Sequence, residues 1–270
     1  MISNVLFISA GVLSLLALWL VVICVRSGGT KDAIQRNISL LVSASMLCTL
    51  IGILELGFIT VSGLVLTLTT VAGFTTLLVQ NLYLIGMWQH GVRGLGLLLL
   101  PLTAIPLLLL PFLPVSSAVP WVEAYSFLET GHLFLSVLAY AMLTMAAVYA
   151  VMQLQLDRAL TQKKIGFFVR AMPSLMHISN YLFVHVRWAL WLLGLSIITG
   201  LAWQWVELHH FALFNHKVLL AVFAWVILMA LYYLRQKSAW HHSRGSKMVL
   251  LAYATLMLAY FGVKIIQNIH

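Results

Sequence analysis

The feature that most constrains this chain is a series of apolar segments, each long enough to cross a lipid bilayer. A membrane-spanning helix needs about 20 predominantly apolar residues, because each residue of an α-helix adds about 1.5 Å along its axis. Eight segments meet this requirement: 5–25, 38–59, 62–87, 96–114, 131–155, 186–206, 216–235 and 247–268. The sequence therefore predicts an all-α fold, a polytopic membrane helical bundle of about eight transmembrane helices.

The composition agrees with a membrane protein. Apolar residues make up 63% of the chain, charged residues make up 8%, and the mean hydropathy is +1.04. A soluble domain is about a quarter charged. No polar stretch is long enough for a separate soluble domain. We therefore expect a single membrane domain over 1–270, in which spans one to four cover 1–114 and spans five to eight cover 131–268.

One connection between spans has a pattern of its own. The segment "MPSLMHISNYLFVHVRW" follows the fifth span and has a proline, Pro173, as its second residue. Proline disfavours the helical conformation of the residue before it. We expect a break at Pro173 and then a short amphipathic helix at the bilayer interface, separate from the span at 186–206.

The positive charge is unevenly distributed between the predicted loops. The chain has 15 Lys and Arg residues against 6 Asp and Glu, a formal net charge of +9. Thirteen of the basic residues lie in or beside four alternate loops: 26–37, 88–95, 156–187 and 235–247. Cytoplasmic loops carry the excess of Lys and Arg, so both termini are predicted outside. The charge then reflects topology and contact with anionic lipid, and no nucleic-acid partner is expected.

Reporter fusions test this topology. A phosphatase that is active only outside the cytoplasm should be active when fused after His270 and inactive when fused at Gln236. The reverse pattern would contradict the predicted orientation, and with it the grouping of outer histidines described next.

Half of the ten histidines are predicted at the outer face: His132, His209, His210, His216 and His270. His132 begins the fifth span, His216 begins the seventh, and His270 ends the chain. Neutral imidazole is a good axial ligand of haem iron and also binds zinc, copper or nickel. For each of these histidines, an interfacial polar side chain is the alternative.

A metal site is one reading of this face. His209, His210 and His216 supply imidazoles, and Glu207 supplies a carboxylate, all of which are ligand types for zinc. Their spacing matches no tight zinc pattern. Such a site would suit an accessory subunit of a divalent-metal transporter.

Catalysis is not indicated. The chain contains neither G-x-S-x-G nor H-E-x-x-H, and no span contains a pair of carboxylates. We therefore expect no enzyme and no catalytic residues.

Two tryptophans, Trp203 and Trp205, end the sixth span and lie close to the histidines in sequence. Tryptophans gather at both interfaces of a bilayer, which is one explanation for them. A stacking platform for a planar porphyrin is the other.

Spans five to eight also resemble a known family. The segments that carry the resemblance are HLFLSVLAYAMLTMAAVYAVMQLQLDRAL (132–160), MPSL (172–175), GLSIITGLAWQW (194–205), HKVLLAVFAWVILMALYYLR (216–235) and LLAYATLMLAYFGVKII (250–266). In order and spacing they are similar to the cytochrome c assembly family of polytopic membrane proteins, the CcsA/CcmC/HemX-like group. The likeness is closest to its small eight-span YpjD-type branch.

The resemblance implies haem handling on the outer side of a bacterial inner membrane. His132 stands at the first of two external histidines that hold haem in haem-presenting members, and Trp203 and Trp205 fall near their tryptophan-rich segment. His216 or His270 would be the opposite ligand. That segment departs from the family pattern here, because an Asn-His pair stands where the family has Asp-Pro.

The predicted function is therefore haem binding in or alongside cytochrome c assembly, without catalysis of ligation. The expected partners are the lipid bilayer, haem and other cytochrome c assembly or membrane proteins. A HemX-like regulator of haem synthesis and the metal-transporter subunit are the alternatives.

Overall fold

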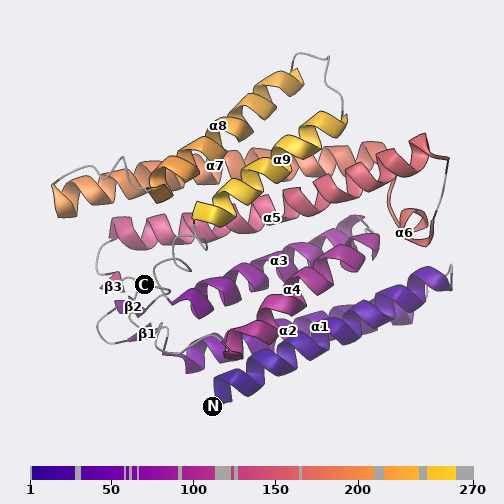
Figure 1. Cartoon of the computed structure of the whole chain (residues 1–270). Coiled ribbons are helices and arrows are strands. Elements are labelled where there is room, and N and C mark those ends of the chain that lie inside the picture. Colours follow the sequence, from indigo (N-terminus) through magenta and orange to yellow (C-terminus); the bar gives the residue numbers. More distant parts are fainter. Residues whose placement is uncertain are drawn as a thin grey trace. The chain divides into compact units, whose positions relative to one another are not determined.

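Figure 1 shows the computed structural model of the chain. It describes residues 2–27, 32–57, 59–60, 63–65, 67–90, 93–112, 123–124, 127–163, 166–209, 216–236 and 242–259. Within these residues the structure consists of helices, apart from three strands of two or three residues. This confirms the predicted helical membrane fold. The described residues form two compact units, while the prediction of a single membrane domain stays a prediction.

Unit 1 comprises residues 1–125 and 165–173. Its helices are α1 (Ile2–Arg26), α2 (Asp32–Glu55), α3 (Leu68–His90), α4 (Gly96–Leu109) and the short α6 (Phe167–Arg170), with 3-10 turns η1 (Arg93–Leu95) and η2 (Leu110–Phe112). Its strands β1 (Ile59–Thr60), β2 (Gly63–Val65) and β3 (Glu123–Ala124) pair antiparallel in that order. The sheet joins the α2–α3 connection to the segment after α4.

A buried polar cluster links four helices of unit 1. The Nε2 atom of Gln80 on α3 donates to Ser14 Oγ on α1 at 2.9 Å, and is 3.3 Å from Ser45 Oγ on α2 and 3.5 Å from Thr103 Oγ1 on α4. The two serine oxygens are 2.9 Å apart. Hydrogen bonds between transmembrane helices contribute about 0.6 kcal/mol each, so the cluster favours this arrangement of α1 to α4 modestly.

Unit 2 comprises residues 126–164 and 174–270. Its helices are α5 (Phe127–Thr161), α7 (Leu175–Leu208), α8 (His216–Gln236) and α9 (His242–Met257). The longest packing interface joins α5 and α7, which run side by side in Figure 1. Helix α9 packs on α5 and α8, and α8 also packs on α7. The α5–α7 pair is therefore the scaffold of this unit.

The prediction of a separate interfacial helix after Pro173 is wrong. The break at Pro173 is confirmed, because α7 begins directly afterwards, with Ser174 as the N-cap that accepts a hydrogen bond from the backbone of His177. From there α7 continues without interruption for 34 residues. Such a helix is roughly 51 Å long, more than the roughly 30 Å hydrocarbon core. Its polar first turns are therefore the extension of a span.

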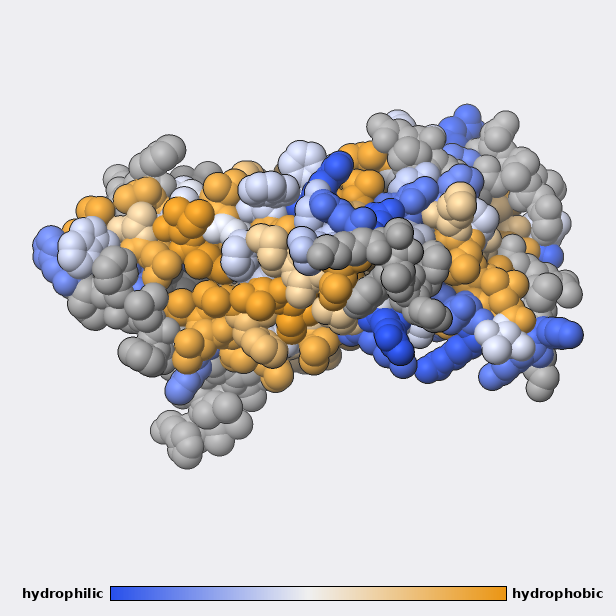
Figure 2. All heavy atoms as spheres, turned by 90° about the horizontal axis from the view of Figure 1, so that it is seen from above, coloured by the Kyte–Doolittle hydropathy of each residue, from blue (hydrophilic) through white to orange (hydrophobic). Residues whose placement is uncertain are grey.

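Each of the eight predicted spans overlaps a helix of the described chain, although the predicted span at 62–87 begins too early, because Gly63–Val65 form strand β2. Six of these helices are long and apolar enough to cross a membrane: α1, α2, α3, α5, α7 and α8. A shorter apolar helix covers Gly96–Phe112, and α9 has 16 residues. In Figure 2, apolar side chains cover much of the visible face, and most hydrophilic ones gather toward its right-hand end. The orientation of the termini stays a prediction.

Candidate functional site

The side chain of His132, near the start of α5, bonds the neighbouring helix α7. Its Nδ1 atom lies 2.7 Å from the backbone oxygen of Ser196. A carbonyl oxygen only accepts hydrogen bonds, so Nδ1 carries the proton and donates it. In a neutral imidazole the other nitrogen, Nε2, then has a free lone pair. None of the described residues forms a hydrogen bond with Nε2.

The hydroxyls of Ser136 and Ser196 form further hydrogen bonds beside this one. Ser136 Oγ donates to the backbone oxygen of His132 at 2.7 Å, and it lies 2.7 Å from Ser196 Oγ. A hydroxyl has a single proton, so Ser196 is the donor in the bond between the two serines. Ser196 Oγ also lies 3.3 Å from His132 Nδ1, where it can only accept. The proton positions of the whole cluster therefore follow from its geometry.

Gly200 allows the imidazole to lie against α7. A Cβ atom added at Gly200 would lie 2.8 Å from both Cε1 and Nδ1 of His132, closer than real Cβ contacts. Gly200 is one helical turn beyond Ser196, so both residues share the face of α7 that meets α5. One face of α7 thus offers the imidazole both a carbonyl acceptor, at Ser196, and space to pack, at Gly200.

Trp203 continues this face of α7, since it lies one turn beyond Gly200. Its indole Nε1 is shielded from solvent, and none of the described residues accepts a hydrogen bond from it. A buried donor without an acceptor costs about 1–3 kcal/mol. An acceptor atom on a bound molecule would remove that cost.

The structure places the other predicted site residues elsewhere or does not describe them. Trp205 points to a different face of α7 and is 54% exposed. His209 is the exposed C-cap of α7, in a left-handed conformation with φ 52°, and His216 is exposed at the start of α8. His210 and His270 lie outside the described residues. Of the predicted site residues, His132 of α5 and Trp203 of α7 therefore lie at the same face of α7.

The described residues contain no group of three or more His, Cys, Asp or Glu side chains that could hold a metal ion. His210 and the side chain of Glu207 are not among the described parts of the chain. The metal site of His209, His210 and His216 therefore stays a prediction.

Comparison with known proteins gives the family. The fold is that of a polytopic helical membrane protein in which the imidazole of His132 links α5 to α7. Residues 2–270 match the model of the family described as Cytochrome C assembly protein, and the chain belongs to that family. This confirms the resemblance seen in spans five to eight.

Curated relatives agree with this assignment. Inner membrane protein YpjD of Escherichia coli strain K12 is 32% identical over 183 residues, which are 66% of this chain and 67% of that protein. An uncharacterized 28.8 kDa protein in the nifR3-like 5' region of Azospirillum brasilense is 32% identical over 139 residues. The match spans about half the length of this second relative, 51%. No solved structure gives a significant match.

Gly200→Ala tests whether the His132 ring needs the glycine. Overpacking costs about 1–3 kcal/mol, and the better helix propensity of alanine offsets roughly 1 kcal/mol of it. We expect a lower midpoint of thermal unfolding for the variant in detergent. Gly131→Ala is the matched control, because a Cβ at this neighbour of His132 meets nothing within 4 Å. Its midpoint should stay or rise; equal midpoints for both variants would contradict the packing argument.

Proposed function

We propose that this protein binds haem at the outer face of a bacterial inner membrane and acts in or alongside cytochrome c assembly, without catalysing thioether ligation. One observation carries the proposal. His132 donates its Nδ1 proton to a backbone carbonyl 2.7 Å away, and its Nε2 atom has no partner among the described residues.

This arrangement suits an axial ligand of haem iron. Histidines that bind metals almost always donate their other ring N–H to a carboxylate, a carbonyl or water, which fixes the tautomer and the direction of the ring. His132 has such an acceptor in the backbone of Ser196, on a helix whose geometry does not depend on a ligand. Iron would accept the Nε2 lone pair. The opposite ligand would be His216 or His270.

Trp203 is the better placed of the two proposed ring contacts. It shares a face of α7 with Gly200, against which the His132 ring lies. Its indole N–H, from which none of the described residues accepts a hydrogen bond, would donate to a carboxylate of the porphyrin. Trp205 points to another face, so it would contribute less. Burial of the apolar ring would supply most of the affinity.

The proposed location rests on three observations. Six helices are suited to cross a membrane, the relative from Escherichia coli is named an inner membrane protein, and the basic loops predict one orientation. In this orientation the start of α5, with His132, faces outward. The lipid bilayer, haem and other proteins of cytochrome c assembly would be the partners.

His132→Ala should abolish or shift the Soret band of the haem-loaded protein, because it removes the proposed iron ligand. Added imidazole should partly restore the band by occupying the vacated position. The visible spectrum of the detergent-purified protein, with and without imidazole, measures both effects.

His177→Ala is the control, since His177 is exposed at the opposite end of the α5–α7 pair, in the first turn of α7. It should leave the spectrum and the haem affinity unchanged. If the His132 variant also keeps its spectrum and affinity, His132 is an interfacial polar residue and the proposal fails.

A further inference from the structure

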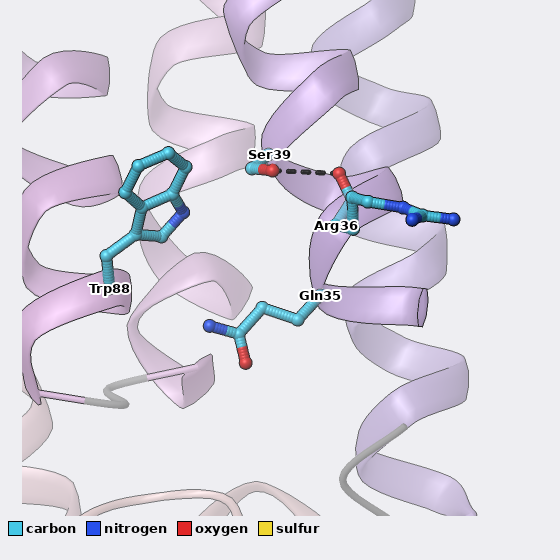
Figure 3. Close-up of a pocket in the computed structure, with 4 residues that line it drawn as sticks. All are labelled: Gln35, Arg36, Ser39 and Trp88. Atoms are coloured by element: carbon cyan, nitrogen blue, oxygen red, sulfur yellow. Dashed lines mark hydrogen bonds between the residues drawn. The ribbon is translucent and has the colours of Figure 1, made fainter. Parts of the chain in front are cut away.

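We propose that a cleft between α2 and α3 of unit 1 binds the headgroup of an anionic membrane lipid. The cleft has a volume of about 320 Å³ and is lined by Gln35, Arg36, Ser39 and Trp88. It is formed by the first turns of α2 and the last turn of α3 (Figure 3). Its volume lies at the small end of the range for ligand pockets. This inference is independent of haem binding.

The lining of the cleft offers hydrogen-bond donors and no carboxylate. In Figure 3 the indole of Trp88 faces α2, with its nitrogen turned toward Arg36 and Ser39. Trp88 is 69% exposed, and none of the described residues accepts a hydrogen bond from its N–H. Ser39 Oγ donates to the backbone oxygen of Arg36 at 2.8 Å, so its lone pairs remain as acceptors. The indole N–H of Trp88 thus faces a lining that contains no carboxylate, and this combination suits a phosphate diester.

Arg36 is the charged residue among the four that line the cleft. The guanidinium of Arg36 extends away from Trp88 at the rim (Figure 3). Arg26, exposed in the last turn of α1, belongs to the same end of unit 1, because α1 ends where α2 begins. Basic pockets between transmembrane helices on the cytoplasmic side bind anionic lipid headgroups. The predicted orientation places this end in the cytoplasmic leaflet.

Exposed apolar side chains continue from the cleft along both helices. Leu40 lies one turn beyond Arg36 on α2 and is 61% exposed, and Ile85 lies one turn before Trp88 on α3 and is 45% exposed. A headgroup in the cleft would place its acyl chains over these two side chains. The ligand is therefore an amphiphile of the phosphatidylglycerol or cardiolipin class, and free phosphate lacks the part that contacts the apolar surface.

Native mass spectrometry of the full chain in detergent tests this site by titration with phosphatidylglycerol and, separately, with phosphatidylcholine. We expect tighter binding of the first phosphatidylglycerol. Arg36→Gln should lower its affinity about fivefold, the effect of one interfacial Arg charge. Trp88→Phe keeps the ring but removes the N–H, and should lower the affinity severalfold, as the loss of one hydrogen bond does.

Arg158→Gln is the matched control, since Arg158 is an exposed arginine in the last turn of α5, in unit 2. This substitution should leave the affinity for the first phosphatidylglycerol unchanged. An equal loss in this control, or equal affinities for the two lipids, would show diffuse or annular binding and overturn the proposal. Displacement of the lipid by inorganic phosphate at the same concentration would also overturn it, because the cleft would then be a free-phosphate site.

Discussion

The core of a bilayer provides no water to backbone N–H and C=O groups, so each crossing segment must satisfy them internally, as a helix does. Many hydroxyls in the described helices obey the same constraint by donating to a carbonyl of their own helix, as Thr76, Thr144 and Thr199 do. Like the side chains of Tyr140 and Trp225, the ring of His132 instead donates to a carbonyl of another helix, in its case that of Ser196. A carbonyl has two lone pairs, so this bond does not require α7 to give up its own hydrogen bond.

The same constraint explains how much of the fold could be predicted from the sequence. Hydropathy and length located each span, because a segment that must be a helix and must cross about 30 Å has little freedom. The prediction for the start of α7 is wrong, because the amphipathic composition after Pro173 belongs to the first turns of a continuous helix, Leu175–Leu208. Between Leu175 and Gly194 there is no Gly or Pro to stop a helix, and an N-cap at Ser174 begins one. Helix-breaking residues, more than polarity, determine where α7 begins.

The candidate site could be predicted only in part. His132 was identified because an imidazole at the end of an apolar helix, within a family-like segment, suggests a ligand. Its environment depends on which residue of α7 lies opposite it on α5. Hydropathy does not predict the register of one helix against another. A signal was nevertheless present: Ser136 follows His132 by four residues, and Gly200 follows Ser196 by four, so each pair shares one helix face. Two small or polar residues at this spacing mark a close contact between transmembrane helices.

The tryptophans of α7 show how neighbouring residues divide between lipid and protein. Trp188 and Trp205 are both more than half exposed, and their separation along the helix is about 25 Å, close to the thickness of the hydrocarbon core. They fit the two interfacial aromatic belts. Trp203 precedes Trp205 by only two residues but turns its indole nitrogen into the protein. A porphyrin beside His132 would thus meet a single tryptophan of this helix, and the bond from Nε2 to iron would contribute correspondingly more to the position of the ring.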